Sequence, residues 1–107
     1  MSRVVSYKKR DVRLLEAFGT VNALENTRWR YDITMTRVAH NMGLVPSAHV
    51  KGLLNELVNM MWLHKMRVPD NRGYGYRDVF RVADDIVPDN PGVNDIKQMR
   101  DGGKRLL

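Results

Sequence analysis

Apolar residues recur at helical spacing over two neighbouring stretches near the middle of the chain. In the first stretch, Thr34–Met42, four of them fall at i, i+3, i+4 and i+7 and share one helix face: Met35, Val38, Ala39 and Met42. The Thr34 hydroxyl can cap the free N–H groups of the first turn. Gly43 follows the last apolar residue, where a residue with a left-handed backbone usually ends a helix. The pattern predicts a short helix with a defined beginning and end.

A second amphipathic helix is expected after a very short connection. Leu44–Ser47 has room only for a sharp corner, and Ser47 is the natural cap of the helix that follows. The apolar positions of this helix are Val50, Leu53, Leu54, Leu57, Val58 and Met61. Two short helices that meet at a corner, the second with a polar leading face, are typical of a helix-turn-helix.

A longer helix is expected upstream, over Arg10–Asn26. Its apolar positions are i, i+4, i+7 and i+10, at Leu14, Phe18, Val21 and Leu24. Gly19 lies inside this stretch and costs about 1 kcal/mol relative to Ala, so the pattern allows one long helix or two shorter pieces. Either form supplies a surface on which the helix pair can pack.

The pattern changes to a period of two before and after the helix pair. Leu63–Val68 alternates, Pro69–Gly73 is a dense turn signal, and Tyr76–Val82 is rich in aromatic and β-branched residues. These segments predict a β-hairpin. Arg28–Ile33 also alternates, with its apolar residues on one side, and is expected to be a third strand. A three-stranded sheet is favoured because a hairpin alone is only marginally stable.

This order of elements resembles the winged helix-turn-helix domain over roughly residues 10 to 83. The residues that carry the resemblance are Val38-Ala39, Met42-Gly43-Leu44, Pro46-Ser47, Val50, Leu53-Leu54, Leu57 and the hairpin His64–Val82. The hairpin, with Asp70 and Arg72 at its tip, is most similar to the wing of MarR-type bacterial regulators. The resemblance implies an α+β fold, mostly helical, with a three-helix core and a small antiparallel sheet. Val45 and Met61 depart from the pattern, since a Ser or Thr cap and a helix-ending glycine commonly stand there.

The domain limits follow from these elements. Residues 1–9 form a basic arm, residues 10–85 the winged helix-turn-helix domain, and residues 86–107 a C-terminal tail. Val93, Ile96 and Met99 allow one short helix in the tail. It could pack on another subunit or fray.

Charge and composition narrow the class of partner. The net charge is +6, with a surplus of 3 basic residues in 1–32 and 4 in 33–83, while 84–107 carries one more acid than base. A basic body favours a polyanion, first nucleic acid and second an anionic membrane surface. The chain has no Cys, which removes disulfides and thiolate metal sites and fits a cytoplasmic protein. No apolar run approaches 18 residues, so we expect no membrane span.

The resemblance implies that the second helix enters the major groove of double-stranded DNA. Its exposed leading face comprises Ser47, Ala48, His49, Lys51, Gly52 and Asn55. Asn55 can pair bidentately with adenine, and His49 or Lys51 can donate to guanine or to phosphate. Ala48 and Gly52 would allow a close approach. The alternative interpretation is an ordinary solvated helix face.

The hairpin is expected to hold the DNA backbone. Its candidate side chains are Lys65, Arg67, Arg72, Tyr74 and Arg77. Thr36 and Arg37, in the first helix of the pair, are also expected to contact DNA. The alternative is a charged hairpin whose charges protect its edges from pairing.

His40, His49 and His64 are too far apart in sequence for any two to share a helical turn, so we expect no metal site. We also expect no cofactor and no enzyme activity, because no nucleophile–base pair or phosphate-cradling loop is evident.

These features predict a small transcription regulator that binds specific DNA sequences. Such domains often act as homodimers on two half-sites, and dimerisation would fall to the first helix and the tail. Two alternatives stay open. One is a winged-helix module that binds protein within a larger assembly, and the other is a replication or mobile-element DNA-binding protein without a regulatory role.

Overall fold

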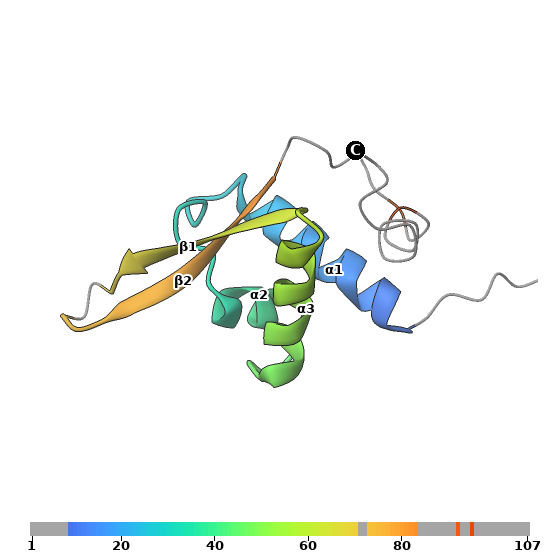
Figure 1. Ribbon diagram of the computed structural model, residues 1–107, viewed down its shortest axis with the longest axis horizontal. Helices are drawn as coiled ribbons and strands as arrows, with labels where there is room; N and C mark the ends of the chain where they lie inside the picture. The colour runs from blue at the N-terminus through green and yellow to red at the C-terminus, as the bar shows by residue number, and fades with distance from the viewer. Residues whose placement is uncertain (1–8, 71–72, 84–91, 93–94, 96–107) are drawn as a thin grey trace, which may run out of the picture.

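Three helices and one β-hairpin make up the α+β structure, a computed structural model that describes residues 9–70, 73–83, 92 and 95 (Figure 1). The elements are α1 (Lys9–Leu24), α2 (Met35–Asn41), α3 (Ala48–Asn59), β1 (Leu63–Pro69) and β2 (Tyr76–Val82). α1 runs through Gly19 without a break, which decides between the two forms expected for it. Lys9, expected in the basic arm, begins α1, while residues 1–8 of that arm, Arg72 and the helix expected near Val93 lie outside the described residues. None of the described helices is long and apolar enough to span a bilayer.

The sequence prediction for α2 is confirmed at both ends. The Thr34 hydroxyl accepts a hydrogen bond from the Arg37 backbone N–H at 3.3 Å and so caps the first turn. At the other end Gly43 has φ of +74°. Its N–H donates to the His40 carbonyl, and the Leu44 N–H donates to the Ala39 carbonyl at 2.8 Å. This pair of bonds is a Schellman closure, which turns the chain sharply towards α3.

α3 ends in the same way, but with methionine in place of glycine. The Met61 N–H donates to the Val58 carbonyl and the Trp62 N–H to the Leu57 carbonyl, both at 2.9 Å. Met61 has φ of +66°, the left-handed backbone conformation that glycine adopts most easily. Its side chain is 59% exposed, so the prediction that Met61 belongs to the buried stripe of α3 is wrong. α3 ends at Asn59, and the left-handed turn at Met61 directs this side chain away from the buried face of the helix.

α3 begins where the sequence predicts, but without the expected side-chain cap. Ser47 occupies the N-cap with an extended backbone, but its hydroxyl makes no cap hydrogen bond. The buried stripe is Val50, Leu53, Leu54 and Leu57, and Val58 is half-buried. The exposed Ser47 hydroxyl is therefore available to an outside partner.

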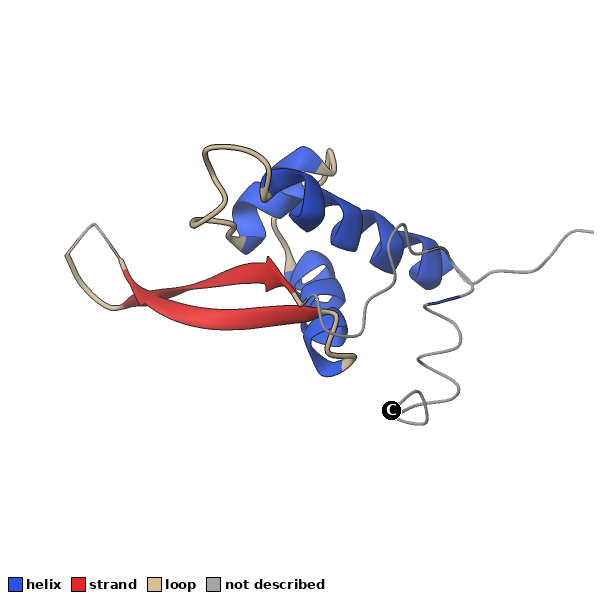
Figure 2. Ribbon diagram, turned by 90° about the horizontal axis from the view of Figure 1, so that it is seen from above, coloured by secondary structure: helices blue, strands red, loops and turns tan. Residues whose placement is uncertain are grey.

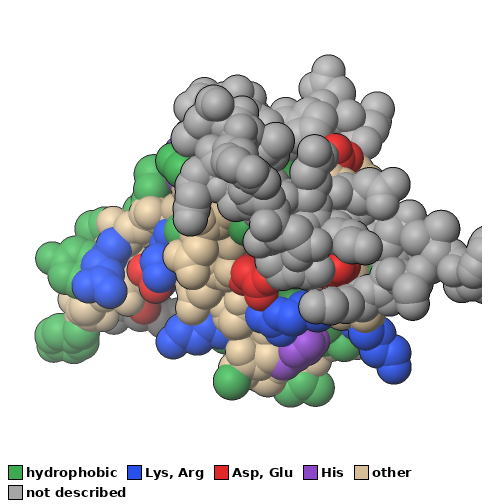
Figure 3. All heavy atoms as spheres, turned by 45° about the vertical axis from the view of Figure 1, so that its right-hand side comes forward, with side chains coloured by type: hydrophobic (Ala, Val, Ile, Leu, Met, Phe, Trp, Pro, Cys, Tyr) green, Lys and Arg blue, Asp and Glu red, His purple; other side chains and the backbone are tan. Residues whose placement is uncertain are grey.

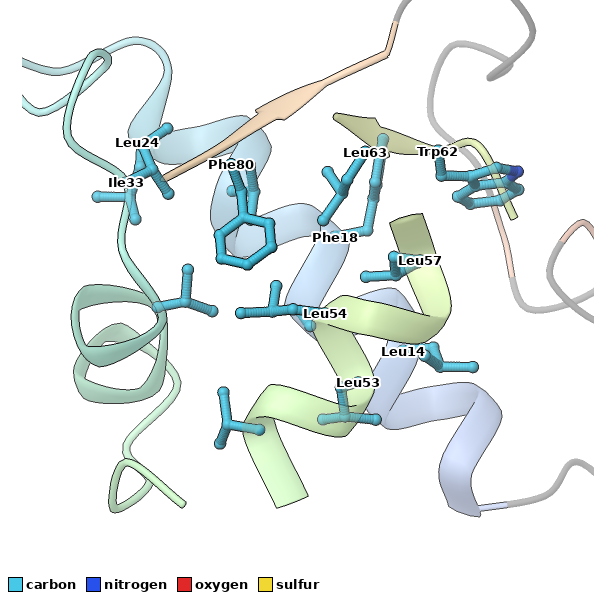
Figure 4. Packing of buried hydrophobic residues seen from close by; sticks show 14 of the residues in the cluster. Leu14, Phe18, Leu24, Ile33, Leu53, Leu54, Leu57, Trp62, Leu63 and Phe80 are labelled. Carbon is cyan, nitrogen blue, oxygen red and sulfur yellow. The ribbon is translucent and has the colours of Figure 1, made fainter. Parts of the chain in front are cut away.

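The hydrophobic core lies where α1 crosses α3 beneath the start of the hairpin (Figure 4). Leu14 and Phe18 of α1 meet Leu53 and Leu57 of α3, and Phe80 comes from β2. The Trp62 ring meets the Phe18 ring edge to face, with the two centroids 5.2 Å apart. Trp62 is 1% exposed and belongs to the core.

The hairpin projects away from the helices as a two-stranded antiparallel sheet (Figure 2). β1 and β2 pair from Leu63 opposite Val82 at the base to Pro69 opposite Tyr76 near the tip. The predicted return strand agrees residue for residue with β2, and β1 extends one residue beyond the predicted Leu63–Val68.

The third strand expected over Arg28–Ile33 is wrong. The segment forms successive turns, in which the Arg30 N–H donates to the Thr27 carbonyl and the Asp32 N–H to the Trp29 carbonyl. Only its last residue makes a backbone hydrogen bond to the sheet among the described residues, where the Ile33 carbonyl accepts from the Phe80 N–H at 2.9 Å. Trp29 is half-buried and Tyr31 is exposed, so the alternation does not mark one face of a strand.

The two helix closures give a matched test of backbone strain. A non-glycine residue with left-handed backbone is disfavoured by about 1 kcal/mol, so Met61→Gly should raise the free energy of unfolding by about that amount. Gly43→Ala should lower it by a similar amount, because the added Cβ meets nothing within 4 Å and only the backbone is strained. Urea denaturation of both variants measures the changes. A destabilised Met61→Gly variant would contradict the assignment of strain and indicate that the Met61 side chain contributes packing.

Candidate nucleic-acid interface

A groove of about 270 Å³ lies between the start of α2, the outer side of α3 and the hairpin. Five residues expected to contact DNA line it: Thr36, Lys51, Asn55, Lys65 and Arg77. They come from α2, α3, β1 and β2, so the fold gathers residues that are up to 41 positions apart in sequence. The structure therefore brings part of the expected set into one concave surface.

The outer side of α3 divides into two flanks. Lys51 and Asn55 lie on the flank that faces the hairpin and line the groove. Glu56 lies on the flank that faces α1, where its Oε1 accepts from Arg10 Nε at 2.7 Å. Gly52 is also near α1, since a Cβ built there would lie 3.6 Å from an Arg10 guanidinium nitrogen. A larger residue at position 52 would therefore meet Arg10 before it blocked an outside partner.

The leading end of α3 is open to solvent. Ser47, Ala48 and His49 are all exposed, as the sequence predicts. The free N–H groups of the first helical turn lie at this end and favour a negatively charged partner. Polar side chains and unpaired backbone donors are thus presented together.

Arg37, expected to contact DNA, is partly buried and held by contacts within the molecule. Its guanidinium lies over the Trp29 ring, 3.6 Å from the centroid. Its Nε donates to the Asp32 carbonyl at 3.3 Å, and Nη2 lies 3.7 Å from the Asp32 carboxylate. These contacts make Arg37 a support for the segment that precedes α2.

Arg77 is held by the same carboxylate. Its Nε donates to Asp32 Oδ1 at 2.8 Å and its Nη1 to the Pro69 carbonyl at 2.6 Å. Asp32 therefore links α2 to β2 through two arginines. Arg77 reaches the groove, but its charge is already partly balanced there.

The hairpin presents Lys65 and Arg67 on the side of the groove. In the strand register Lys65 lies opposite Phe80 and Arg67 opposite Asp78, so Lys65 and Arg67 share the face that continues from the core. Arg67 Nε lies 3.6 Å from Asp78 Oδ1 in a mostly exposed pair. Tyr74 near the tip is 92% exposed. Lys65 has no ion-pair partner among the described residues.

The molecular surface agrees with this distribution of charge. Figure 3 shows Lys and Arg side chains recurring along the lower edge of one face, from the hairpin to the helices, with a histidine between them. The three histidines, His40, His49 and His64, are exposed. In the described part of the chain no three His, Cys, Asp or Glu side chains come together as metal ligands would.

Sequence reasoning missed the cluster around Asp32 and the arginines that lie on aromatic rings. The signal was present in Arg28-Trp29-Arg30-Tyr31-Asp32, where cationic and aromatic residues alternate and a carboxylate follows. That pattern satisfies a strand as well as a set of cation–π contacts, and the sequence alone does not separate the two. Comparison with known proteins adds no assignment, because no family model, curated protein or solved structure matches the chain.

The role of Asp32 can be measured with a double-mutant cycle. Asp32→Asn and Arg77→Gln should show a coupling of about 1 kcal/mol in the free energy of unfolding, because their 2.8 Å contact is partly shielded from solvent. Arg67→Gln with Asp78→Asn is the matched control. Its coupling should be at most a few tenths of a kcal/mol, because that pair is longer and more exposed. Equal couplings in the two cycles would mean that Asp32 does not hold the hairpin in place.

Proposed function

We propose that the domain is a winged helix-turn-helix that binds double-stranded DNA in a sequence-specific manner, as a small transcription regulator. The observation that carries the proposal is the groove, where Lys51 and Asn55 of α3 face Lys65 of the hairpin and Thr36 of α2. A helix with open polar positions beside a basic hairpin suits a duplex, whose major groove admits an α-helix between two phosphate backbones.

α3 would read the bases. The Asn55 amide can donate to and accept from the major-groove edge of adenine, and Lys51 can donate to guanine. Ser47 and His49, at the exposed leading end of α3, would lie at the entrance to the major groove of the DNA. Ala48 beside them is small enough to permit a close approach to the bases.

The hairpin and α2 would hold the backbone. The hairpin carries three exposed donors, Lys65, Arg67 and the Tyr74 hydroxyl. Arg72, next to Gly73 in the sequence, is proposed to contact the backbone as well. The Thr36 hydroxyl lies in the first turn of α2 and lines the groove, where it can donate to a phosphate. Arg37 and Arg77 act indirectly in this proposal, since their contacts with Asp32 position the hairpin.

Two further parts of the proposal depend on the class of protein rather than on the groove. Winged-helix regulators commonly bind as dimers to half-sites about one helical turn apart, and α1 is the element with exposed surface for such a contact. The absence of Cys supports a cytoplasmic location.

Salt dependence gives the first test. Binding to duplex DNA should weaken steeply between 50 and 200 mM salt, with a log–log slope of about −0.9 for each phosphate contact. Fluorescence anisotropy with a labelled random duplex measures the affinity at each concentration. Absence of binding at low salt would overturn the DNA proposal and favour the protein-interaction module.

Substitutions in the groove separate base reading from backbone contact. Once a preferred sequence has been selected from a random pool, Asn55→Ala should lose about 1–3 kcal/mol of discrimination against other sequences. Lys65→Ala should weaken all sequences alike and reduce the salt slope by about 1. Asn59→Ala, at the exposed far end of α3 and outside the groove, is the matched control and should change neither quantity. If Asn55→Ala and Lys65→Ala weaken every sequence equally, α3 does not read bases through Asn55.

A further inference from the structure

A second basic surface surrounds Tyr31, outside the groove. Tyr31 is 70% exposed, although it is a large aromatic residue. The guanidinium carbon of Arg30 lies 5.1 Å from the centroid of its ring, and that of Arg81 lies 5.9 Å from the same centroid. Two arginines from different elements thus converge on one exposed ring.

Arg28 extends this surface along the same segment. Its guanidinium carbon lies 4.7 Å from the centroid of the Trp29 ring, which also carries Arg37 at 3.6 Å. A guanidinium held over a ring keeps its N–H groups directed outwards along its edge. We name Arg28, Arg30, Tyr31 and Arg81 the outer arginine surface.

None of these arginines forms an ion pair with a carboxylate in the described structure. Of the acidic side chains in the adjoining segment, Asp32 is taken by Arg37 and Arg77. Glu25 accepts a hydrogen bond from the Val82 N–H. None of the ion pairs among the described residues includes Arg28, Arg30 or Arg81.

The outer arginine surface lies on the other face of the hairpin from Lys65. The register places Arg81 opposite His64, one position along each strand from the pair Lys65 and Phe80. Successive residues of a strand point to opposite faces, so Arg81 points away from the face of Phe80. None of the four residues of the outer arginine surface lines the groove, so a duplex held there would leave this surface accessible.

We propose that the outer arginine surface binds the phosphate backbone of a second DNA duplex, so that one molecule joins two duplexes. The inference rests on the proposed function for its first duplex. Guanidinium edges match the paired oxygens of a phosphate, and the Tyr31 hydroxyl adds a donor between them. A polyanion is favoured as the partner because three arginines lie close together here and none of them forms an ion pair among the described residues.

A bridging assay tests the inference. One duplex is immobilised on beads, a second carries a fluorescent label, and the labelled duplex is captured only if the protein joins the two. The wild-type protein should capture it. Arg30→Gln combined with Arg81→Gln should reduce capture roughly tenfold through loss of two phosphate contacts, while the affinity for a single duplex at limiting protein stays within about twofold.

Two further variants control for charge and for the groove. Lys9→Gln with Arg13→Gln removes the same charge from α1 and should leave capture unchanged. Lys51→Gln with Lys65→Gln removes groove cations and should reduce both single-duplex binding and capture. Circular dichroism confirms that each variant is folded.

The outcomes separate this inference from the proposed function. A wild-type protein that binds one duplex but captures no second one overturns the bridging inference alone. Capture that persists in Arg30→Gln/Arg81→Gln also overturns it, since the second duplex would then be held by the groove of another copy. A wild-type protein that binds no duplex at low salt overturns the proposed function itself.

Discussion

The junction between the segment before α2 and strand β2 is the constraint on which the groove depends. Ile33 is fully buried and its carbonyl accepts from the Phe80 N–H, while the adjacent Asp32 pairs with Arg37 and Arg77. Burying a side chain the size of Ile33 or Phe80 contributes about 1.5–3 kcal/mol, whereas a partly exposed ion pair contributes less than about 1 kcal/mol. Apolar packing therefore supplies most of the stability of the junction. The ion pairs contribute orientation, because the contacts of Arg37 and Arg77 with Asp32 restrict the angle between β2 and the segment before α2.

This division explains which charges remain available to a ligand. Arg77 lies in the groove, but its interaction with Asp32 and the Pro69 carbonyl already satisfies much of its guanidinium. Lys51 and Lys65 have no such partner among the described residues, so they are the groove cations open to a polyanion. Asp78 also lines the groove, where it lies 3.6 Å from Arg67. A polyanion that enters the groove need not break an internal ion pair to reach these lysines. In the proposed function, binding would therefore leave the contacts around Asp32 intact.

Local patterns in the sequence were sufficient for most of the fold. The cap at Thr34, the left-handed closure at Gly43 and the strand Tyr76–Val82 each depend on residues close together in the chain, and all three agree with the structure. The strand expected at Arg28–Ile33 failed because a period of two has more than one physical cause. Here Trp29 and Ile33 turn inwards, and Tyr31 stays exposed between arginines.

The site was less predictable than the fold, because the role of a cation depends on what lies beside it. In sequence, Arg37, Arg77 and Lys65 are equivalent candidates for phosphate contact. In space, a carboxylate 45 positions from Arg77 and five from Arg37 occupies both arginines, and no local pattern reveals that shared partner. Met61 is a similar case, since helical spacing places it in the stripe of α3 while a closure formed with Leu57 and Val58 removes it.

Lysine and arginine are divided between two kinds of task in this molecule. The cations with fixed geometry, on rings or on Asp32, are arginines, whereas Lys51 and Lys65 in the groove are lysines. A guanidinium is planar and weakly hydrated, so it stacks and forks at defined angles, while an ammonium is a mobile, strongly hydrated point charge. Lysines in the groove can adjust to phosphates at varied positions along a duplex. Arg37 and Arg77, held on Asp32, position the hairpin beside these lysines, so in the proposed function the arginines fix the shape of the surface and the lysines supply its adjustable charge.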